Sequence, residues 1–363
     1  MKRQVVNSIM GFVLAGTMLA GCGGTASTSS ENSSQTSSAT KTVSSEAADS
    51  SKQVVEAASS AVTEAGTSGD VTIGVSWCAM ESQMWEEYKR SVESEAKTQN
   101  ITLKESVAEN DVQKQNQQIE DFISQGVDAI IIAPADGDAV VSAIKEANEA
   151  GIPVIMANRA AGEGADVYAT ISSDNKAMVG REIDYIAENA SEGTKYRCLE
   201  LVGSLTDVNA IARQEGFEEA IKKYPDMFEL VTSVPTEWKG DQALAAVQNT
   251  FSSDDTVNFI FSPSDALLPS IISGLQQLGK YKKVGEDGHV TLVTFDGAAD
   301  AINAIREGYV DVVTVQDATK QGELCVQAAV DAVNGKEAQD YTDPGFEVTT
   351  ENCKTDYADF NGY

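Results

Sequence analysis

The fold prediction rests on residues 128–159, which read DAIIIAPADGDAVVSAIKEANEAGIPVIMANR. An apolar run at 129–133 leads into a Pro-Ala-Asp turn, a segment of helical period follows, and a second apolar run occupies 153–157. Continuous apolar runs are typical of strands buried on both faces of a parallel sheet. The stretch therefore predicts a β-α-β unit with a right-handed crossover, and hence an α/β fold.

The same alternation continues on both sides of this stretch. Apolar runs occur at 71–75, 101–103, 129–133, 153–157, 199–202, 257–261, 290–295 and 310–315. Amphipathic helices between them carry apolar faces made of Val140, Ile144 and Ala147; of Val179, Ile183, Ile186 and Ala190; and of Leu244, Val247 and Phe251. A chain of 363 residues is long enough for two such domains.

Composition excludes several classes of function. The formal charge of -30 argues against a nucleic-acid partner, because phosphate binding needs clustered Lys and Arg, and it favours a soluble acidic surface. The chain has a single histidine, His289, so it cannot form catalytic arrangements that need several histidines. We expect His289 to lie at the edge of a loop. The five cysteines show no Cys-x-x-Cys spacing. Apart from Cys22, we expect mostly free thiols at Cys78, Cys198, Cys325 and Cys353, with a Cys325 to Cys353 disulfide as the alternative.

The first seventy residues predict an exported, anchored protein. Lys2 and Arg3 precede a short apolar stretch at 9–20, which indicates a signal peptide over 1–21. It ends in Leu-Ala-Gly-Cys, which resembles the bacterial lipobox and makes Cys22 the lipidated residue; an ordinary secretory signal with an incidental cysteine is the alternative. Residues 22–69 are rich in Ser, Thr, Ala and Glu, which predicts a disordered tether ahead of a folded part that begins near Val71.

Polar and aromatic residues gather after the predicted strands, where open α/β sheets bind their ligands. They are Trp77, Glu81, Gln83, Trp85, Asn158, Arg159, Ser264, Asp265, Asp296 and Gln316. Carboxylates, amides and guanidinium groups satisfy the hydroxyls of a sugar, and an aromatic ring covers its C–H face. The set therefore predicts a sugar site.

The order of these motifs resembles the ribose-binding-protein group of type I periplasmic binding proteins over about 71–348. Residues 128–159 carry the most specific match. Further matches are Ser-Ser-Asp-Asn at 172–175, Arg-Gln-Glu-Gly-Phe at 213–217, Phe-Asp-Gly at 295–297, and Gln316 before a helix.

The resemblance implies two Rossmann-like lobes with parallel sheets, joined by a three-segment hinge near Ser173, Gln316 and Gly345. The N-terminal lobe would comprise 71–173 plus 317–345, and the C-terminal lobe 174–316 plus 346–363. Closure about the hinge would trap the ligand.

The resemblance also implies the ligand contacts, which are Glu81, Ser82, Met84, Trp85, Asn158, Arg159, Arg213, Trp238, Ser264, Asp265, Asp296 and Gln316. Two of them depart from the family pattern: Asn158 stands where an aspartate is common, and Ser264 where an asparagine is common. We expect all three tryptophans in strand-end loops. Trp85 and Trp238 would stack on the ligand from opposite lobes, while Trp77 is either a further contact or core.

The resulting functional prediction is a receptor without catalytic activity. It is the lipid-anchored, extracytoplasmic, monomeric solute-binding protein of a sugar ABC importer, which binds a monosaccharide or polyol without cofactor or metal and delivers it to permease and ATPase subunits. A sugar receptor that feeds a sensor kinase or chemotaxis system is the main alternative. A surface hydrolase using Glu81 and Asp296, and a sugar-responsive repressor, are weaker ones. A metal site at Asp136 and Asp138 is a weak possibility, but an Asp-Gly-Asp segment is usually a turn.

Overall fold

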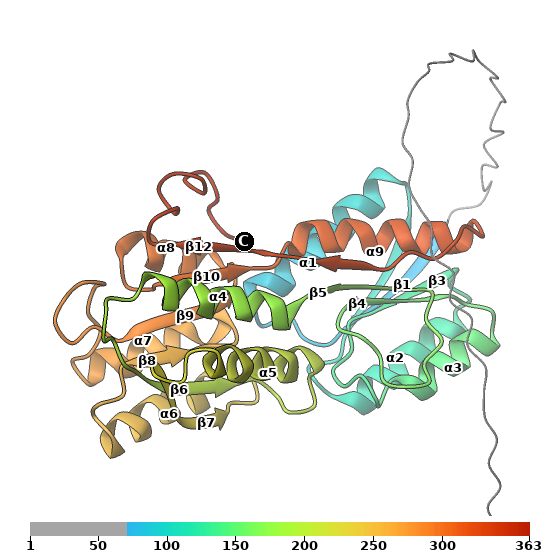
Figure 1. Ribbon diagram of the computed structural model, residues 1–363. Coiled ribbons are helices and arrows are strands. Elements are labelled where there is room, and N and C mark those ends of the chain that lie inside the picture. The colour runs from blue at the N-terminus through green and yellow to red at the C-terminus, as the bar shows by residue number, and fades with distance from the viewer. Residues whose placement is uncertain (1–70) are drawn as a thin grey trace, which may run out of the picture. The chain divides into compact units, whose positions relative to one another are not determined.

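The computed structural model describes residues 71–363; the predicted signal peptide (1–21), Cys22 and the tether (22–69) lie outside the described residues. The described part contains two six-stranded sheets with helices packed on both faces of each (Figure 1). This arrangement confirms the predicted α/β class with two mostly parallel sheets. Within residues 71–363, no helix combines the length and the apolar character needed to cross a membrane.

We call the first sheet with its helices the N-lobe. Its strands lie in the order β11-β5-β4-β3-β1-β2, and every pair is parallel. The strands are β1 (Thr72–Trp77), β2 (Thr102–Val107), β3 (Ala129–Ile132), β4 (Val154–Asn158), β5 (Ala169–Ser173) and β11 (Tyr341–Asp343), and the helices are α1 (Gln83–Thr98), α2 (Val112–Ser124), α3 (Val141–Glu149) and α9 (Ala318–Val333). Helices α1 and α9 pack together on one face, and α2 and α3 cover the other.

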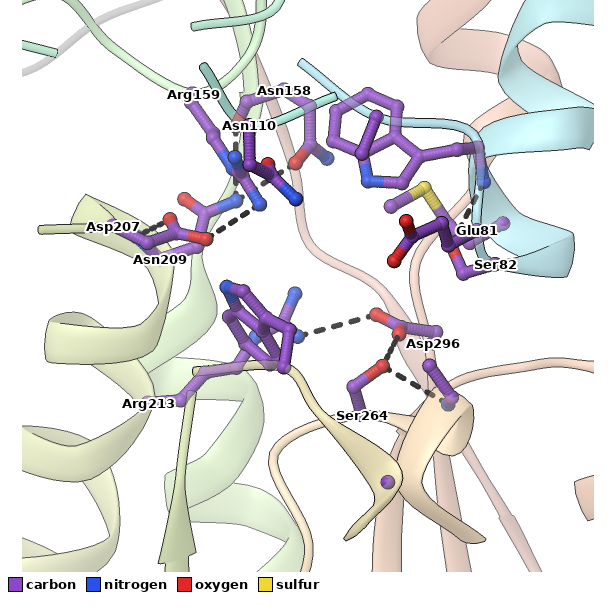
Figure 2. Close-up of a pocket in the computed structure, with 16 residues that line it drawn as sticks. Glu81, Ser82, Asn110, Asn158, Arg159, Asp207, Asn209, Arg213, Ser264 and Asp296 are labelled. Carbon is purple, nitrogen blue, oxygen red and sulfur yellow. Dashed lines mark hydrogen bonds and ion pairs between the residues drawn. The ribbon is translucent and has the colours of Figure 1, made fainter. Parts of the chain in front are cut away.

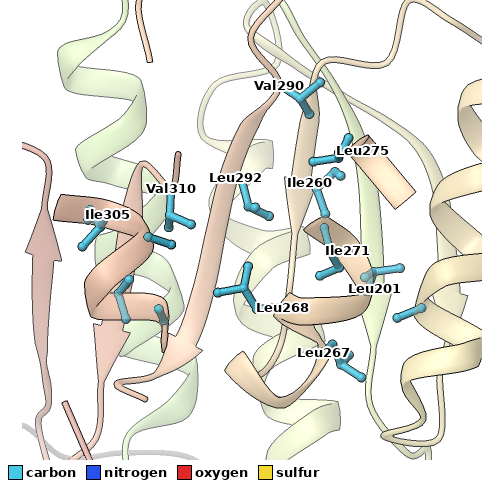
Figure 3. Packing of buried hydrophobic residues seen from close by; sticks show 14 of the residues in the cluster. Leu201, Ile260, Leu267, Leu268, Ile271, Leu275, Val290, Leu292, Ile305 and Val310 are labelled. Atoms are coloured by element: carbon cyan, nitrogen blue, oxygen red, sulfur yellow. The ribbon is translucent and has the colours of Figure 1, made fainter. Parts of the chain in front are cut away.

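We call the second sheet with its helices the C-lobe. Its order is β12-β10-β9-β8-β6-β7, and only β12 runs antiparallel to its neighbour. The strands are β6 (Tyr196–Val202), β7 (Phe228–Pro235), β8 (Phe259–Phe261), β9 (Thr291–Asp296), β10 (Val312–Val315) and β12 (Phe346–Thr349), and the helices are α4 (Asn175–Asn189), α5 (Val208–Lys222), α6 (Gly240–Ser253), α7 (Leu268–Gln277) and α8 (Ala299–Glu307). An aliphatic core joins α6, α7 and α8 to one face (Figure 3), while α4 and α5 cover the other.

The chain passes between the two sheets three times: between β5 and α4, between β10 and α9, and between β11 and β12. The three crossings are bonded to one another. The N–H of Asp174 donates to the carbonyl of Asp343 at 3.0 Å, and the Ser173 hydroxyl donates to Gln316 Oε1 at 3.1 Å. Gly345 has φ +59°, and a Cβ there would lie 2.7 Å from the carbonyl oxygen of Val315, so this crossing requires glycine.

The eight predicted apolar runs became β1, β2, β3, β4, β6, β8, β9 and β10, with ends shifted by a few residues. Four strands were missed: β5, β7, β11 and β12. Strands β7, β11 and β12 lie at sheet edges, and β5 alternates buried with half-buried residues. Such strands lack the continuous apolar run that fully buried strands show, so the pattern used for prediction did not detect them.

The four described cysteines are buried free thiols. Cys325 lies in a core of the N-lobe, whereas Cys353 lies in a core of the C-lobe. The alternative disulfide between these two residues is therefore wrong, because their side chains belong to separate cores.

Candidate functional site

A cavity of about 260 Å³ lies between the lobes, at the carboxyl ends of their strands (Figure 2). Ligand pockets usually measure about 300 to 1,000 Å³, so this cavity lies just below that range and suits only a small ligand. The residues that line it are Ala79, Glu81, Ser82, Met84, Trp85, Asn110, Asn158, Arg159, Asp207, Asn209, Arg213, Trp238, Gly240, Ser264, Ala266 and Asp296. Ten of the twelve predicted contacts are among them.

The start of α1 forms the aromatic wall on the N-lobe side. Ser82 caps this helix by accepting a hydrogen bond from the N–H of Trp85 at 3.3 Å, which fixes the turn that carries Met84 and Trp85. Trp77 is fully buried in β1, and its ring packs edge-on against Trp85 and Tyr88 with centroids 6.3 and 5.9 Å away. Trp77 is therefore core that supports Trp85. The expectation of loop positions was wrong for Trp77, in β1, and for Trp85, in α1.

Asn158 ends β4 and joins the two lobes through both ends of its amide. Its Nδ2 donates to Gln316 Oε1 at 2.9 Å, while its Oδ1 accepts from Asn209 Nδ2 of the C-lobe at 2.8 Å. An aspartate here could not donate to Gln316. The departure from the family pattern at this position thus fits a neutral, bridging role.

Arg159 follows at once and is almost fully buried. Its Nη1 donates to the carbonyl of Pro134 at 3.0 Å, and its Nη2 forms an ion pair of 2.5 Å with Asp207 Oδ2 of the C-lobe. The guanidinium carbon lies 5.4 Å from the centre of the Trp85 ring. Burial acts to lower the pKa of Arg159, but the carboxylates of Asp207 and Asp296 outweigh it and raise this pKa.

Arg213 of α5 occupies the C-lobe wall. Its guanidinium donates to Asn175 Oδ1 at 2.7 Å, to the carbonyl of Pro263 at 2.6 Å and to Asp296 Oδ1 at 3.2 Å, and its Cζ lies 3.8 Å from the centre of the Phe295 ring. Burial lowers the pKa of Arg213, against the opposing effect of Asp296. The arginine is thus held rigidly by bonds on several sides.

Asp296, the last residue of β9, collects three donors. Besides Arg213, it accepts from Ser264 Oγ at 2.6 Å and from Gln316 Nε2 at 2.7 Å. Burial raises the pKa of Asp296, and Arg213 opposes that rise. A carboxylate held by three donors is suited to fixing a guanidinium and a ligand hydroxyl, which speaks against the predicted alternative of a hydrolase that uses it with Glu81.

Trp238 follows β7 and approaches the end of β6 closely. A Cβ on Gly203 would lie 2.1 Å from the indole of Trp238, so only glycine allows the ring to lie there. The indole Nε1 is buried and has no hydrogen-bond partner within residues 71–363, and the same is true of Arg159 Nε. One unsatisfied donor therefore belongs to each lobe.

Four residues of the lining have left-handed backbone conformations: Asn110 with φ 58°, Asn158 with φ 63°, Trp238 with φ 58° and Asp296 with φ 116°. Non-glycine residues rarely adopt positive φ, and the cost is about 1 to 3 kcal/mol each. Such strain is typical of functional sites, because the surrounding bonds must hold it in place.

Two predicted contacts lie outside the lining of the cavity. Asp265 turns away and accepts from Thr294 Oγ1 at 2.6 Å and from the N–H groups of Gly297 and Ala298, each at 2.7 Å. Gln316 is fully buried behind Asn158 and Asp296. The structure thus assigns both residues to supporting the cavity wall and the hinge.

Sequence reasoning missed three polar residues of the lining: Asn110, Asp207 and Asn209. Asn110 follows β2, while Asp207 and Asn209 lie at the junction of β6 and α5. Their place after predicted strands was the available signal. That signal does not separate them from ordinary helix caps and loop residues, which the same residue types also form.

The remaining polar candidates are structural. Asp136 Oδ1 accepts from the N–H groups of Asp138 and Ala139, both at 3.0 Å, which is a turn. His289 lies at a loop edge, as predicted, where Nε2 contacts Asp311 at 3.0 Å. Within residues 71–363, no group of three or more His, Cys, Asp or Glu side chains is arranged to hold a metal ion.

Comparisons with known proteins agree with this geometry. A model of the periplasmic binding protein domain matches residues 73–337. The ribose import binding protein of Bacillus subtilis is 26% identical over 277 residues, 76% of this chain and 86% of that protein. The xylitol-binding protein of Mycolicibacterium smegmatis is 30% identical over 281 residues, 77% of this chain and 76% of that protein.

A solved structure gives the same result. The solute-binding protein of an ABC transporter from Bacillus halodurans, determined with bound myo-inositol, is 28% identical, and the match covers 81% of this chain and 99% of that one with a TM-score of 0.72. These relatives are binding proteins, in agreement with the prediction of a receptor without catalytic activity. The chain belongs to the periplasmic binding protein domain family, as a ribose-binding-protein-like, type I solute-binding protein of the sugar ABC transporter class.

Proposed function

We propose that this protein is the lipid-anchored, extracytoplasmic receptor of a sugar importer, and that it binds one monosaccharide or polyol in the cavity between its lobes. The observation that carries the proposal is a pair of buried donors without acceptors, Arg159 Nε and Trp238 Nε1, on two side chains that line the cavity. A buried donor without a partner costs about 1 to 3 kcal/mol, and a ligand rich in oxygen acceptors would recover that cost.

The lining supplies the other contacts that such a ligand needs. Trp85 and Trp238 line the cavity from opposite lobes and supply aromatic surface for the C–H groups of a sugar, while Asn110, Ser264 and Asp296 supply polar side chains. The known relatives bind ribose and xylitol by name, and the solved relative holds myo-inositol, all neutral polyhydroxylated molecules. We assign the same class of ligand to this chain.

Binding would close the lobes about the three crossing segments near Ser173, Gln316 and Gly345. Bonds across the cleft support this step, because Gln83 Oε1 of α1 accepts from the N–H of Ala299 at 2.9 Å, and Asn209 donates to Asn158 at 2.8 Å. A ligand that touches both lobes favours the closed form, which the permease subunits of the importer would recognise. We propose that the receptor acts as a monomer.

The anchor and the location rest on the sequence. The Leu-Ala-Gly-Cys motif predicts a lipid on Cys22, and residues 22–69 would tether the folded part to the outer face of the cell membrane. A sugar receptor that signals to a sensor kinase or chemotaxis system would use the same cavity and remains the second candidate. Loss of uptake on deletion of the gene, with no loss of a transcriptional response, favours import.

A thermal-shift screen tests the ligand class. The purified chain is heated with D-ribose, xylitol, myo-inositol, D-allose and L-arabinose. At a ligand concentration 100 times the dissociation constant, binding adds about 2.7 kcal/mol, which raises the melting temperature by about 5 to 10 °C. No shift with any neutral sugar or polyol at millimolar concentration would refute the proposed ligand class.

A further inference from the structure

The cavity contains five ionisable side chains, and four of them neutralise one another in pairs. Arg159 pairs with Asp207 at 2.5 Å, and Arg213 pairs with Asp296 at 3.2 Å. Glu81 forms no ion pair with any residue that the structure describes, and Figure 2 shows its carboxylate directed toward the cavity. Two guanidinium groups and three carboxylates give the lining a formal charge of −1.

The pair of Arg159 and Asp207 differs from an ordinary surface salt bridge. The side chains come from opposite lobes and are only 9% and 1% exposed. A guanidinium in such a place would be the natural partner for a carboxylate or phosphate of a ligand, because it binds these groups through two parallel bonds. In this protein, Nη2 of Arg159 already contacts Oδ2 of Asp207 at 2.5 Å, so a carboxylate of the protein itself neutralises the guanidinium.

We propose that Asp207 sets the charge selectivity of the cavity: it neutralises Arg159, so the cleft accepts neutral sugars and polyols and rejects sugar acids and sugar phosphates. The inference rests on the proposed function, since it takes the cavity as a sugar site. An anionic ligand would have to displace Asp207 from Arg159 and leave a buried carboxylate unpaired, while Glu81 and Asp296 repel it.

The local structure allows a clean removal of this charge. Asp207 is also the N-cap of α5, where its Oδ1 accepts from the N–H of Asn209 at 2.9 Å. Asparagine caps helices as well as aspartate does, so Asp207→Asn keeps the cap and removes only the charge. Asp111→Asn is the matched control, because Asp111 caps α2 in the same way and is exposed outside the cavity lining.

The experiment measures binding by titration calorimetry for wild type, Asp207→Asn, Asp111→Asn and the double variant Asp207→Asn with Arg159→Gln. The probes are the neutral ligands D-ribose, xylitol and myo-inositol, and the anions D-glucuronate and D-ribose 5-phosphate. We expect Asp207→Asn to raise affinity for at least one anion by about tenfold or more, since a charge-assisted pair with Arg159 becomes available. The double variant should lose this gain, and Asp111→Asn should match wild type.

Three results would overturn the inference. They are that wild type binds an anion as tightly as its neutral ligands, that Asp207→Asn gains no affinity for either anion, or that all affinities change by the same factor, as a merely structural role would produce. If no neutral probe binds wild type, the proposed function fails. The affinities of wild type and Asp207→Asn for glucuronate still decide the role of Asp207. Should Asp207→Asn misfold, Asp207→Ser retains the cap and takes its place.

Discussion

Glu200 offers the sharpest test of the C-lobe interior. This residue of β6 is fully buried, and neither carboxylate oxygen has a hydrogen-bond partner within residues 71–363. Burial raises the pKa of Glu200 from 4.5 to about 7, and the carboxylate of Glu218 adds to the rise. The folded protein therefore holds a proton that the unfolded chain releases at lower pH.

The sign of the effect follows from this difference. An acid whose pKa is higher in the folded state stabilises the fold fully at pH values below its pKa in the unfolded state. This stabilisation is lost as the pH rises through the pKa of the folded state. Between about pH 5 and about pH 8.5, Glu200 should remove about 2.5 kcal/mol from the free energy of unfolding. Glu200→Gln keeps the shape of the side chain but does not titrate. The free energy of unfolding of the variant minus that of wild type should therefore rise by about 2.5 kcal/mol between the lower and the higher pH.

Urea unfolding followed by circular dichroism at both pH values measures the difference between Glu200→Gln and wild type. Comparing the two proteins cancels the contributions of other buried acids, such as Glu182, whose pKa burial also raises. An exposed substitution, Glu192→Gln, controls for the loss of one negative charge. A difference between variant and wild type that stays constant from pH 5 to pH 8.5 would refute the reasoning.

Three further changes probe the cleft. Gly203→Ala should weaken sugar binding by about tenfold or more while the fold survives, because the new Cβ displaces the Trp238 indole; calorimetry and circular dichroism measure the two effects, and unchanged affinity would contradict this role. Asp296→Ala should lower the free energy of unfolding by about 3 to 5 kcal/mol in addition to abolishing binding, because it leaves a buried guanidinium unpaired, and a melting temperature equal to that of wild type would disprove it. Asn209→Ala removes the bond to Asn158 across the cleft, so the ligand-free protein should open and its radius of gyration by small-angle X-ray scattering should rise; an unchanged radius would show that this bond does not hold the lobes.

Much of the site was predictable because its residues follow recognisable strands. Arg159, Arg213 and Asp296 lie in motifs whose order along the chain is informative, and all three line the cavity. Neighbouring residues were harder to separate. Ser264 faces the cavity and Asp265 does not, because a short 3-10 helix at Asp265–Leu267 turns the second side chain toward the backbone after β9.

The sequence alone determined the α/β class, the positions of eight strands along the chain and the edge at which polar side chains collect, because buried strands and amphipathic helices leave local periodic patterns. Tertiary structure decided which side chains pair. Arg159 and Asp207 belong to different lobes, and their contact exists only because the hinge brings the ends of β4 and β6 together. A local pattern contains no information about such a distance, so the charge balance of the cavity could be read only from the folded chain.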